Sequence, residues 1–388
     1  MKIPFKYNLR NIRVRWTTSL LTAGGTALTV AVFIGIMSLA KGLDLTMQTS
    51  GDPLNLIAMR QGSTAELNSQ VTQEQYQTIR YLEGVAQSEG EFLVSPEMVV
   101  AINRPRRGST QGANITLRGI KLVGLKLRPN MQITEGRMFR PGMREVIVSH
   151  RIQDRFQDTG LGDRMRFGSS NWEVVGIFDA AGTTQDSEIW ADLTLLSQAF
   201  GRGDRLSSVL IHVIDTDTMD VMAARIQDDP RLLMKVQPET EYYQEANTGS
   251  ELIRILGNFV AIIMGIGACF AGMNTMYAAV INRRQEIATL RVLGFKRRNI
   301  LFSFATESLT LALIGGGVGC ILALPINGLS TGTINFATFS EVAFAFRVTP
   351  DLLFSGIIFA TFLGFFGGLL PSWSAARQQI VQALRDTV

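Results

Sequence analysis

The chain has 388 residues, of which 46% are hydrophobic and 18% charged, with a mean hydropathy of +0.17 and a net charge of +4. Its two cysteines, Cys269 and Cys320, offer no zinc or iron–sulfur ligand spacing, so a metal site of that kind is excluded. Residues 44–250 hold 27 acidic and 21 basic residues, so the basic excess lies outside them, beside apolar segments. This distribution argues against a nucleic-acid partner.

Residues 1–15 are predicted to form a cytoplasmic amphipathic helix. Apolar side chains recur at helical spacing, at Phe5, Leu9, Ile12 and Trp16, and basic residues lie between them. Two interpretations remain open for this helix: it lies at the membrane surface, as is typical of a helix with one apolar and one basic face, or it docks onto a cytoplasmic partner.

Four stretches without a charged residue predict four membrane-spanning helices. They are Trp16–Ala40, Ile255–Asn282, Ser308–Ser340 and Leu352–Ala376. Because an α-helix rises about 1.5 Å per residue, about 20 apolar residues cross the hydrocarbon core of a bilayer. The predicted spans are 16–43, 251–282, 299–324 and 352–376. The chain is therefore predicted to be a membrane protein with four transmembrane helices and a large domain, residues 44–250, between the first and second.

The large domain is predicted to be α+β. Short apolar runs alternate with turn residues, and Thr72 is a candidate N-cap for a helix that ends before Gly84. Strands are predicted at 91–94, 98–102, 115–118, 122–123, 145–149, 172–178 and 209–214, and helices at 150–157, 193–200 and 216–227. This mixture of elements indicates an α+β fold, with two subdomains as one arrangement of it.

No catalytic constellation is predicted in this domain. Its histidines are His150, at the start of a polar helix, and His212, inside a strand, and a structural role is favoured for both. No G-x-S-x-G nucleophile motif occurs. The chain is therefore predicted not to be an enzyme, with no catalytic, cofactor-binding or metal-binding residues.

Residues 283–298 are predicted to form a short amphipathic helix between the second and third spans. Ile287, Leu290 and Leu293 give an apolar stripe, with Arg283, Arg284 and Arg291 on other faces. Gly294 is a helix stop, and a new helix starts near Asn299. Two interpretations remain open: a helix lying on the membrane surface, or a helix that docks onto a cytoplasmic partner. Glu307, two turns further on, is predicted to reach the cytoplasmic interface in a structural role.

Glycines in the last two spans are predicted to mediate helix packing. Gly315 and Gly319 are four residues apart, as are Gly364 and Gly368. This spacing lets helix backbones approach closely, although glycine is also simply common in membrane helices. Residues 325–351 are predicted to be an extracytoplasmic loop and 377–388 a cytoplasmic tail.

The basic residues near the spans predict the orientation. Residues 1–43 contain lysines and arginines and no acid, and 283–298 contain six basic residues against Glu286 alone. Basic loops resist translocation, so both termini and 283–298 are predicted to be cytoplasmic and 44–250 extracytoplasmic.

The segment from Asn282 to Gly294, together with Glu307, resembles the core motif of FtsX/MacB-type ABC permeases. A glycine-rich span follows it at Ile314–Gly319, as in that family, and Glu135–Phe139 in the large domain resembles the MacB-like periplasmic core. Asn282 stands where the family often has Glu, Ala288 where it often has Gly, and Phe295-Lys296 where small residues are frequent.

The resemblance implies a mechanotransmitting permease of the bacterial inner membrane. It would work as a homodimer or with a paired permease, with ABC ATPase subunits, in contact with membrane lipid, and with a periplasmic adaptor as a further candidate partner. The 283–298 helix would be the coupling helix, with Arg284, Glu286, Leu290, Arg291 and Gly294 as the coupling residues. ATP and Mg would be bound by the partner, since no G-x-x-x-x-G-K-[ST] phosphate loop occurs in this chain.

Three functions follow as hypotheses. The first is a permease that couples ATP hydrolysis by a separate subunit to extracytoplasmic change, and so exports or extracts an envelope substrate. The second is a transmembrane regulator that transmits the same motion to an extracytoplasmic enzyme such as a cell-wall hydrolase. The third, an autonomous membrane-anchored enzyme or sensor, predicts no ATPase partner.

Overall fold

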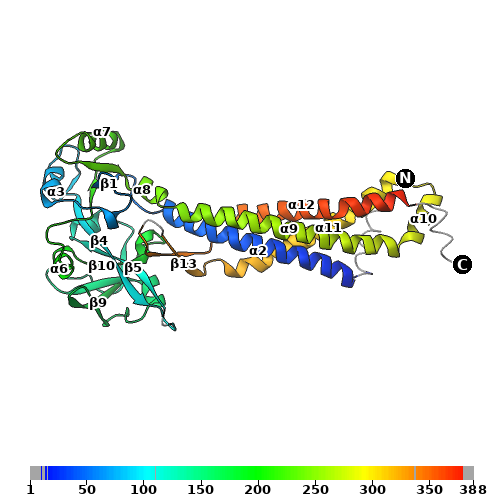
Figure 1. Ribbon diagram of the computed structural model, residues 1–388, viewed down its shortest axis with the longest axis horizontal. Helices are drawn as coiled ribbons and strands as arrows, with labels where there is room; N and C mark the ends of the chain where they lie inside the picture. The colour runs from blue at the N-terminus through cyan, green and yellow to red at the C-terminus, as the bar shows by residue number, and fades with distance from the viewer. Residues whose placement is uncertain (1–9, 11–13, 15, 110, 336–337, 379–388) are drawn as a thin grey trace. The chain divides into compact units, whose positions relative to one another are not determined.

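The computed structural model describes residues 1–388 except 1–9, 11–13, 15, 110, 336–337 and 379–388. The chain divides into two compact units (Figure 1). The first, here called the helical unit, comprises Met1–Lys41, Leu252–Leu329 and Phe346–Val388. The second, here called the sheet unit, comprises Gly42–Glu251 and Ser330–Ala345.

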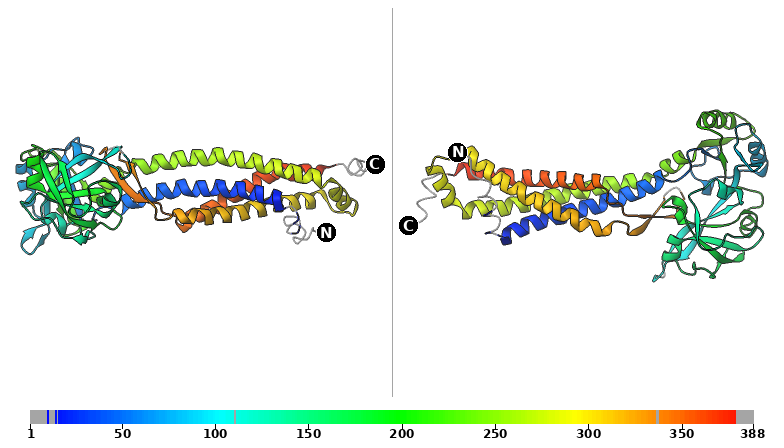
Figure 2. Two further views of the ribbon diagram at one scale, coloured as in Figure 1. Left: turned by 90° about the horizontal axis from the view of Figure 1, so that it is seen from below. Right: turned by 180° about the vertical axis from the view of Figure 1, so that it is seen from behind.

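In the described part of the chain, four helices are long and apolar enough to cross a membrane. They are α2 (Trp16–Gln48), α9 (Thr248–Asn282), α11 (Arg297–Ala323) and α12 (Pro350–Arg377). They run side by side in Figures 1 and 2. The predicted fold class, four membrane helices with a large domain between the first and the second, is confirmed.

Shorter elements connect these helices. The helix α10 (Arg284–Val292) lies between α9 and α11, and the 3-10 helix η3 (Leu324–Ile326) follows α11. Pro350 stands in the first turn of α12, where its missing N–H leaves no hydrogen bond unmade. The amphipathic helix predicted for 1–15 lies almost entirely outside the described residues, which include only Arg10 and Val14 of it, and it stays a prediction.

The sheet unit is built on a mixed sheet that has ten strands among the described residues. The strands are β1 (Asn55–Arg60), β4 (Val94–Pro105), β5 (Gly112–Ile120), β6 (Gln132–Gly136), β7 (Glu145–Ser149), β8 (Arg164–Phe167), β9 (Ser170–Asp179), β10 (Glu188–Asp192), β11 (Ser208–His212) and β12 (Met234–Pro238). Their order is β12-β1-β11-β4-β5-β10-β7-β9-β6, with β8 paired to β9. The long strand β4 holds the two halves together, because its start pairs with β11 and its remainder with β5.

Helices cover the sheet, and several begin at the caps that their sequences predict. They are α3 (Gln73–Arg80), α4 (Val123–Lys126), α5 (His150–Arg155), α6 (Leu193–Ala199), α7 (Thr216–Gln227) and α8 (Glu239–Glu245), with the 3-10 turns η1 (Glu66–Asn68) and η2 (Thr184–Ser187). Thr72 caps α3, since its hydroxyl accepts the Gln75 N–H at 3.2 Å and the Gln75 side chain accepts the Thr72 N–H. Asp192 and Asp215 cap α6 and α7 in the same way.

The core of the sheet unit follows the pleat of its strands. On β10, Ile189 and Ala191 enter a large apolar cluster on one face, whereas Trp190 enters a smaller one with Phe178 on the other. Side chains of a strand alternate between faces, so this central strand is buried on both sides.

Several segments differ from the sequence-based prediction: the helix predicted at 283–298 extends only over α10 (Arg284–Val292), because Gly294 ends it and α11 begins at Arg297, and two further segments differ in kind. Leu122 and Val123, predicted as a strand, begin the helical turn α4, because local hydrogen bonds close the chain here: the N–H of Gly124 donates to the carbonyl of Lys121 at 2.9 Å and that of Leu125 to Leu122 at 3.1 Å. The loop predicted at 325–351 contains a hairpin of β13 (Ser330–Ile334) and β14 (Glu341–Ala345), which belongs to the sheet unit. A further two-stranded element, β2 (Gln87–Ser88) with β3 (Glu91–Phe92), lies apart from the main sheet.

Candidate functional site

The helix α10 has well-defined ends. It starts after a break at Arg283, whose backbone (φ −116°, ψ 17°) is not helical. It ends at Gly294, which has a φ of +93°, a conformation that favours glycine. The N–H of Phe295 donates to the carbonyl of Leu290 at 3.1 Å and that of Gly294 to Arg291 at 3.1 Å, the bond pattern of a Schellman cap. The chain therefore turns sharply on both sides of a nine-residue helix.

The inner side of α10 packs on the membrane helices. Ile287 is buried in an apolar cluster to which α9, α11 and α12 also contribute. The members of the cluster are Met276, Val280, Ile287, Ile300, Phe304 and Ala375. Burial of this kind stabilises the helix far more than its intrinsic propensity, since isolated helices of this length are marginal. The helix is thus fixed to the ends of its neighbours.

The outer side of α10 is open. Of the five predicted coupling residues, Arg284, Glu286 and Gly294 are exposed, and Leu290 and Arg291 are half-buried. Arg291 donates from Nη1 to the carbonyl of Phe295 at 3.4 Å, within the turn that closes the helix. The structure therefore brings all five onto one short element, three of them accessible to a partner.

The predicted apolar stripe on this helix is wrong in detail. Ile287 faces inward, whereas Leu293 is 66% exposed and Val292 is 64% exposed. Arg283, placed on another face by the prediction, is buried on the same side as Ile287. The reason is the break at Arg283 and the cap at Gly294, which limit regular helical spacing to the residues between them. The exposed surface of α10 therefore combines basic and apolar groups.

Sequence reasoning missed one residue of this site, Arg283. Its Nη1 atom lies 2.8 Å from Oε2 of Glu307 on α11, and both side chains are buried. Its Nε atom lies 3.1 Å from Glu286, and its guanidinium lies 4.8 Å from the ring centroid of Phe304. One signal pointed to a buried basic partner: Glu307 is an isolated carboxylate in an apolar span.

Gly315 and Gly319 lie where α11 crosses α2. A Cβ on Gly315 would lie 2.5 Å from the carbonyl oxygen of Ala23, and one on Gly319 would lie 2.6 Å from that of Ala27. Real Cβ atoms do not approach this closely, so the two helices touch backbone to backbone here. This contact leaves no room for a Cβ atom at position 315 or 319, so both positions require glycine.

Gly364 and Gly368 lie where α12 crosses α11. A Cβ on Gly364 would lie 2.5 Å from Cβ of Ala312, and one on Gly368 would collide with Ser308. The hydroxyl of Ser308 also donates to the carbonyl of Gly364 at 2.9 Å. The glycine pairs thus bring α2 and α12 into close contact with α11.

A buried ion network lies inside the sheet unit. Arg118 contacts Glu66 at 2.8 Å, Glu97 at 2.6 Å and Glu188 at 2.8 Å, and Arg128 contacts Glu97 at 2.7 Å. Burial raises the pKa of Glu97, but the two guanidinium groups more than offset this and hold the pKa below its ordinary value. The adjoining cavity has a volume of about 50 Å³, enough for a water molecule but not for a substrate. The network therefore cross-links strands.

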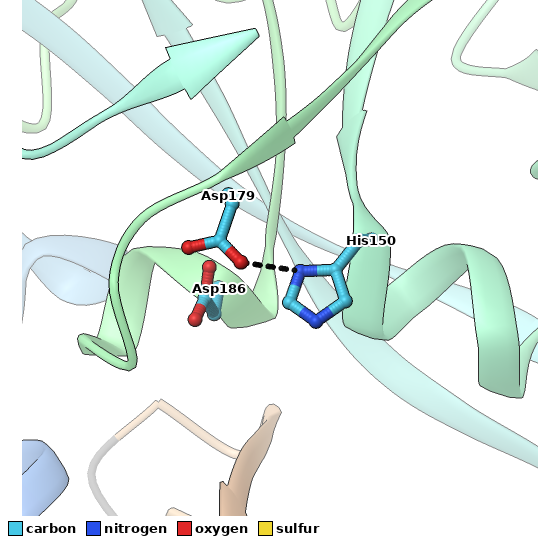
Figure 3. A group of neighbouring side chains, drawn as sticks. All are labelled: His150, Asp179 and Asp186. Carbon is cyan, nitrogen blue, oxygen red and sulfur yellow. Dashed lines mark ion pairs between the residues drawn. The ribbon is translucent and has the colours of Figure 1, made fainter. Parts of the chain in front are cut away.

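His150, Asp179 and Asp186 form a separate polar group at the ends of β9, α5 and η2 (Figure 3). Nδ1 of His150 lies 3.2 Å from Oδ2 of Asp179. The buried carboxylate of Asp186 accepts the N–H groups of Ala180 at 2.6 Å and Gly182 at 2.9 Å, and Arg151 lies 3.5 Å from it. The ligand atoms of the three side chains lie within 4.8 Å of one another, a spacing compatible with a metal ion, so the prediction of no metal-binding residue stays a prediction. His212, the other histidine, lies 2.8 Å from the side-chain oxygen of Asn55.

The β13–β14 hairpin is fastened to the body of the sheet unit by polar contacts. Glu341, which is 3% exposed, pairs with Arg106 at 2.5 Å and with Arg155. The N–H of Ala343 donates to the hydroxyl of Ser187 at 2.7 Å, and Thr116 donates to Ser340 at 2.8 Å. These contacts, here called the hairpin clamp, attach the segment between α11 and α12 to the α+β domain.

The fold and the site define a multi-pass membrane protein with an inserted α+β domain and a short exposed helix between its second and third spans. Residues 19–229 match the MacB-like periplasmic core domain, and residues 258–380 match the FtsX-like permease C-terminal domain. The first match covers more than half of the chain. The chain belongs to the MacB/FtsX-type ABC transporter permeases.

Two relatives match over nearly their full length. An uncharacterised ABC transporter permease of Methanocaldococcus jannaschii is 22% identical over 98% of this chain and 96% of its own. YknZ, an uncharacterised ABC transporter permease of Bacillus subtilis, is 24% identical over 97% of this chain and 99% of its own. The solved extracellular domain of a YknZ transporter matches 47% of this chain and 98% of its own at 22% identity, with a TM-score of 0.36.

A third relative is longer than this chain. The pyoverdine export ATP-binding/permease protein PvdT of Pseudomonas entomophila is 27% identical over 66% of this chain. The matched region spans 40% of the length of that protein.

Proposed function

We propose that this chain is the permease subunit of an ABC transporter in the bacterial inner membrane, and that it couples ATP hydrolysis by a separate ATPase subunit to a conformational change in the sheet unit. This change drives the export or extraction of an envelope substrate. The observation that carries the proposal is the geometry of α10, a short helix buried on one side against three membrane helices and exposed on the other.

The exposed side of α10 is suited to a protein partner. Arg284 offers a charge, and Val292 and Leu293 offer exposed apolar surface at the end of the helix. Arginine is among the side chains that supply most of the affinity in protein interfaces, and burial of exposed apolar surface is favourable on association. The inner side of α10 is packed against α9, α11 and α12, so a force that displaces α10 displaces these three helices together.

Motion of these helices is transmitted to the sheet unit through the covalent connections between the two units. The chain passes between the two units at 41–42, 251–252, 329–330 and 345–346. The last two crossings flank the hairpin, which the hairpin clamp attaches to β5, α5 and η2. In this proposal, α11 and α12 move the α+β domain through the hairpin that connects them. The helix α2 moves it through the residues after 41, and α9 through the residues before 252.

ATP and Mg belong to the partner subunit, and the permease itself is not catalytic. Both termini and α10 face the cytoplasm, as the basic residues around them favour, and the sheet unit faces outward. The chain works as a homodimer or with a related permease. In support, the full-length relatives are called permeases, while PvdT, called an ATP-binding/permease protein, extends well beyond the matched region.

Co-purification tests the docking of the ATPase. The full chain, expressed with the ABC ATPase of its own genome, is expected to purify as a complex. Reversal of an exposed charge, Arg284→Glu, is expected to reduce the bound ATPase at least fivefold, whereas Arg166→Glu on the exposed edge of β8 leaves it unchanged. Absence of any complex in the unaltered chain would overturn the proposal.

Affinity capture through the sheet unit separates export from regulation. In the export function, an adaptor or cargo is recovered with the outer domain. Recovery of a cell-wall hydrolase in its place would favour the regulator, in which the same motion controls an extracytoplasmic enzyme.

A further inference from the structure

Among the described residues, three side chains contact the guanidinium group of Arg283 at the break between α9 and α10. Glu307 of α11 accepts from Nη1 at 2.8 Å, and Glu286 of α10 accepts from Nε at 3.1 Å. The ring of Phe304 lies below the group at 4.8 Å. One side chain thus contacts both α10 and α11 from the residue that follows the end of α9.

The two carboxylates around Arg283 are in different environments. The side chain of Glu307 is 8% exposed, whereas that of Glu286 is 54% exposed. A buried ion pair restrains its partners strongly, because separating them would leave an uncompensated charge in a site that water does not reach. The Glu307 contact therefore restrains Arg283, and the Glu286 contact, in water, restrains it little.

We propose that Arg283 is the positioning residue of the coupling helix: paired with Glu307, it fixes the orientation of α10 relative to α11, so that displacement of α10 by the ATPase moves α11 rather than bending the chain at the break. This proposal rests on the function proposed above. The apolar cluster around Ile287 holds the two helices together, but apolar contacts are non-directional, and the ion pair supplies the direction.

The geometry of the break makes such a restraint necessary. Arg283 is neither in α9 nor in α10, and its backbone (φ −116°, ψ 17°) departs from helical geometry, so the regular helix is interrupted there. A pivot between the docking helix and the span that it drives would absorb the motion. A side chain anchored at the pivot and bonded across to α11 removes that freedom.

The distance between α10 and α11 tests the proposal directly. Spin labels at Gln285→Cys and Phe302→Cys, both exposed, are placed in the full chain without its native cysteines, in lipid nanodiscs. The unaltered pair is expected to give a narrow distance distribution. Glu307→Gln is expected to broaden it at least twofold, and Glu286→Gln, which removes the exposed carboxylate beside the same guanidinium, is expected to leave it narrow.

The charge exchange Arg283→Glu with Glu307→Arg separates positioning from folding. It restores an ion pair at the same place and is expected to restore the narrow distribution. Binding of the ATPase provides a second readout: the affinity is expected to fall about threefold to tenfold in Glu307→Gln, since a mobile α10 must be ordered on docking, and to recover in the exchanged chain.

Each outcome decides the proposal. An unchanged distribution in Glu307→Gln would overturn it, and so would equal broadening in Glu286→Gln. If Glu307→Gln does not fold, the exchanged chain decides alone: a narrow distribution supports the proposal, and a broad one or renewed misfolding overturns it. The distance is measured without the ATPase, so a chain that shows the expected distances but binds no ATPase would contradict the proposed function and not the positioning role.

Discussion

Gly315 of α11 lies directly against the backbone carbonyl of Ala23 on α2, so closely that a Cβ atom would stand 2.5 Å from the oxygen. Gly317, two residues along the same helix, has nothing within 4 Å of the corresponding position. We therefore expect Gly315→Ala to force α2 away from α11 and to lower the thermal stability of the purified chain, at a cost of about 1–3 kcal/mol as for other overpacked sites.

The matched variant is Gly317→Ala. Alanine has a higher helix propensity than glycine, so this change is expected to be neutral or to stabilise by up to about 1 kcal/mol. Thermal unfolding in detergent measures both. Equal melting temperatures for the two variants would contradict the close contact of α2 with α11.

Arg118 is expected to be the most sensitive charged residue of the sheet unit. It pairs with Glu66, Glu97 and Glu188 in the core, and Arg118→Ala leaves these buried carboxylates with Arg128, which pairs with Glu97, as the remaining guanidinium of the network. Loss of one partner from a buried ion pair costs about 3–5 kcal/mol. Denaturant unfolding should show this loss, while Arg166→Ala, on an exposed strand position, stays within about 0.5 kcal/mol of the unaltered chain.

Glu239 gives the sheet unit a pH dependence. Burial raises the pKa of its carboxyl group, and the hydrogen bonds from Asn55 and Asp52 with the charge of Arg128 offset this only in part. A carboxyl whose pKa is raised on folding stabilises the folded state while it is protonated, and this contribution is lost as the pH rises through the raised pKa.

Glu239→Gln mimics the protonated form at every pH. We expect it to raise the melting temperature at pH 7.5 and to have little effect near pH 4, with Glu241→Gln, exposed on the same helix, changing neither. A melting temperature lowered at pH 7.5 would show that the charged carboxylate is the stabilising form.

The hairpin clamp is expected to depend on Glu341. Glu341→Ala leaves Arg106 and Arg155 without this partner and should free β13 and β14 from the body of the domain. Hydrogen exchange at Ala343, whose N–H is bonded to Ser187, should then speed up at least tenfold. Glu91→Ala, which removes an exposed ion pair with Lys126, is the control; equal protection of Ala343 in all three chains would rule out the clamp.

Local signals predicted most of the secondary structure. The helix expected at 216–227 is α7 residue for residue, because Asp215 caps it and the apolar spacing continues to Ile226. The pairing of Glu341 with Arg106 was not predictable, since 235 positions separate the two residues and no local pattern connects them. The same holds for Arg283 and Glu307, whose contact depends on the break before α10 and on the packing of three helices.

The glycines of the membrane helices show what residue spacing predicts and what it does not predict. Spacing alone indicated that Gly315, Gly319, Gly364 and Gly368 stand at helix contacts. It could not say that the first two touch α2 and the last two touch α11, because that choice is made by shape complementarity between whole helices.

Accessibility labelling of two single cysteines tests the central claim, that force applied to α10 on the inner side of the membrane reaches a domain on the outer side. In a chain without Cys269 and Cys320, Gln285→Cys reports on α10 and Ser169→Cys on the sheet unit; both positions are exposed. A membrane-impermeant maleimide is expected to label position 169 in intact cells and position 285 only after the membrane is opened. Labelling of both positions from the same side would contradict the account.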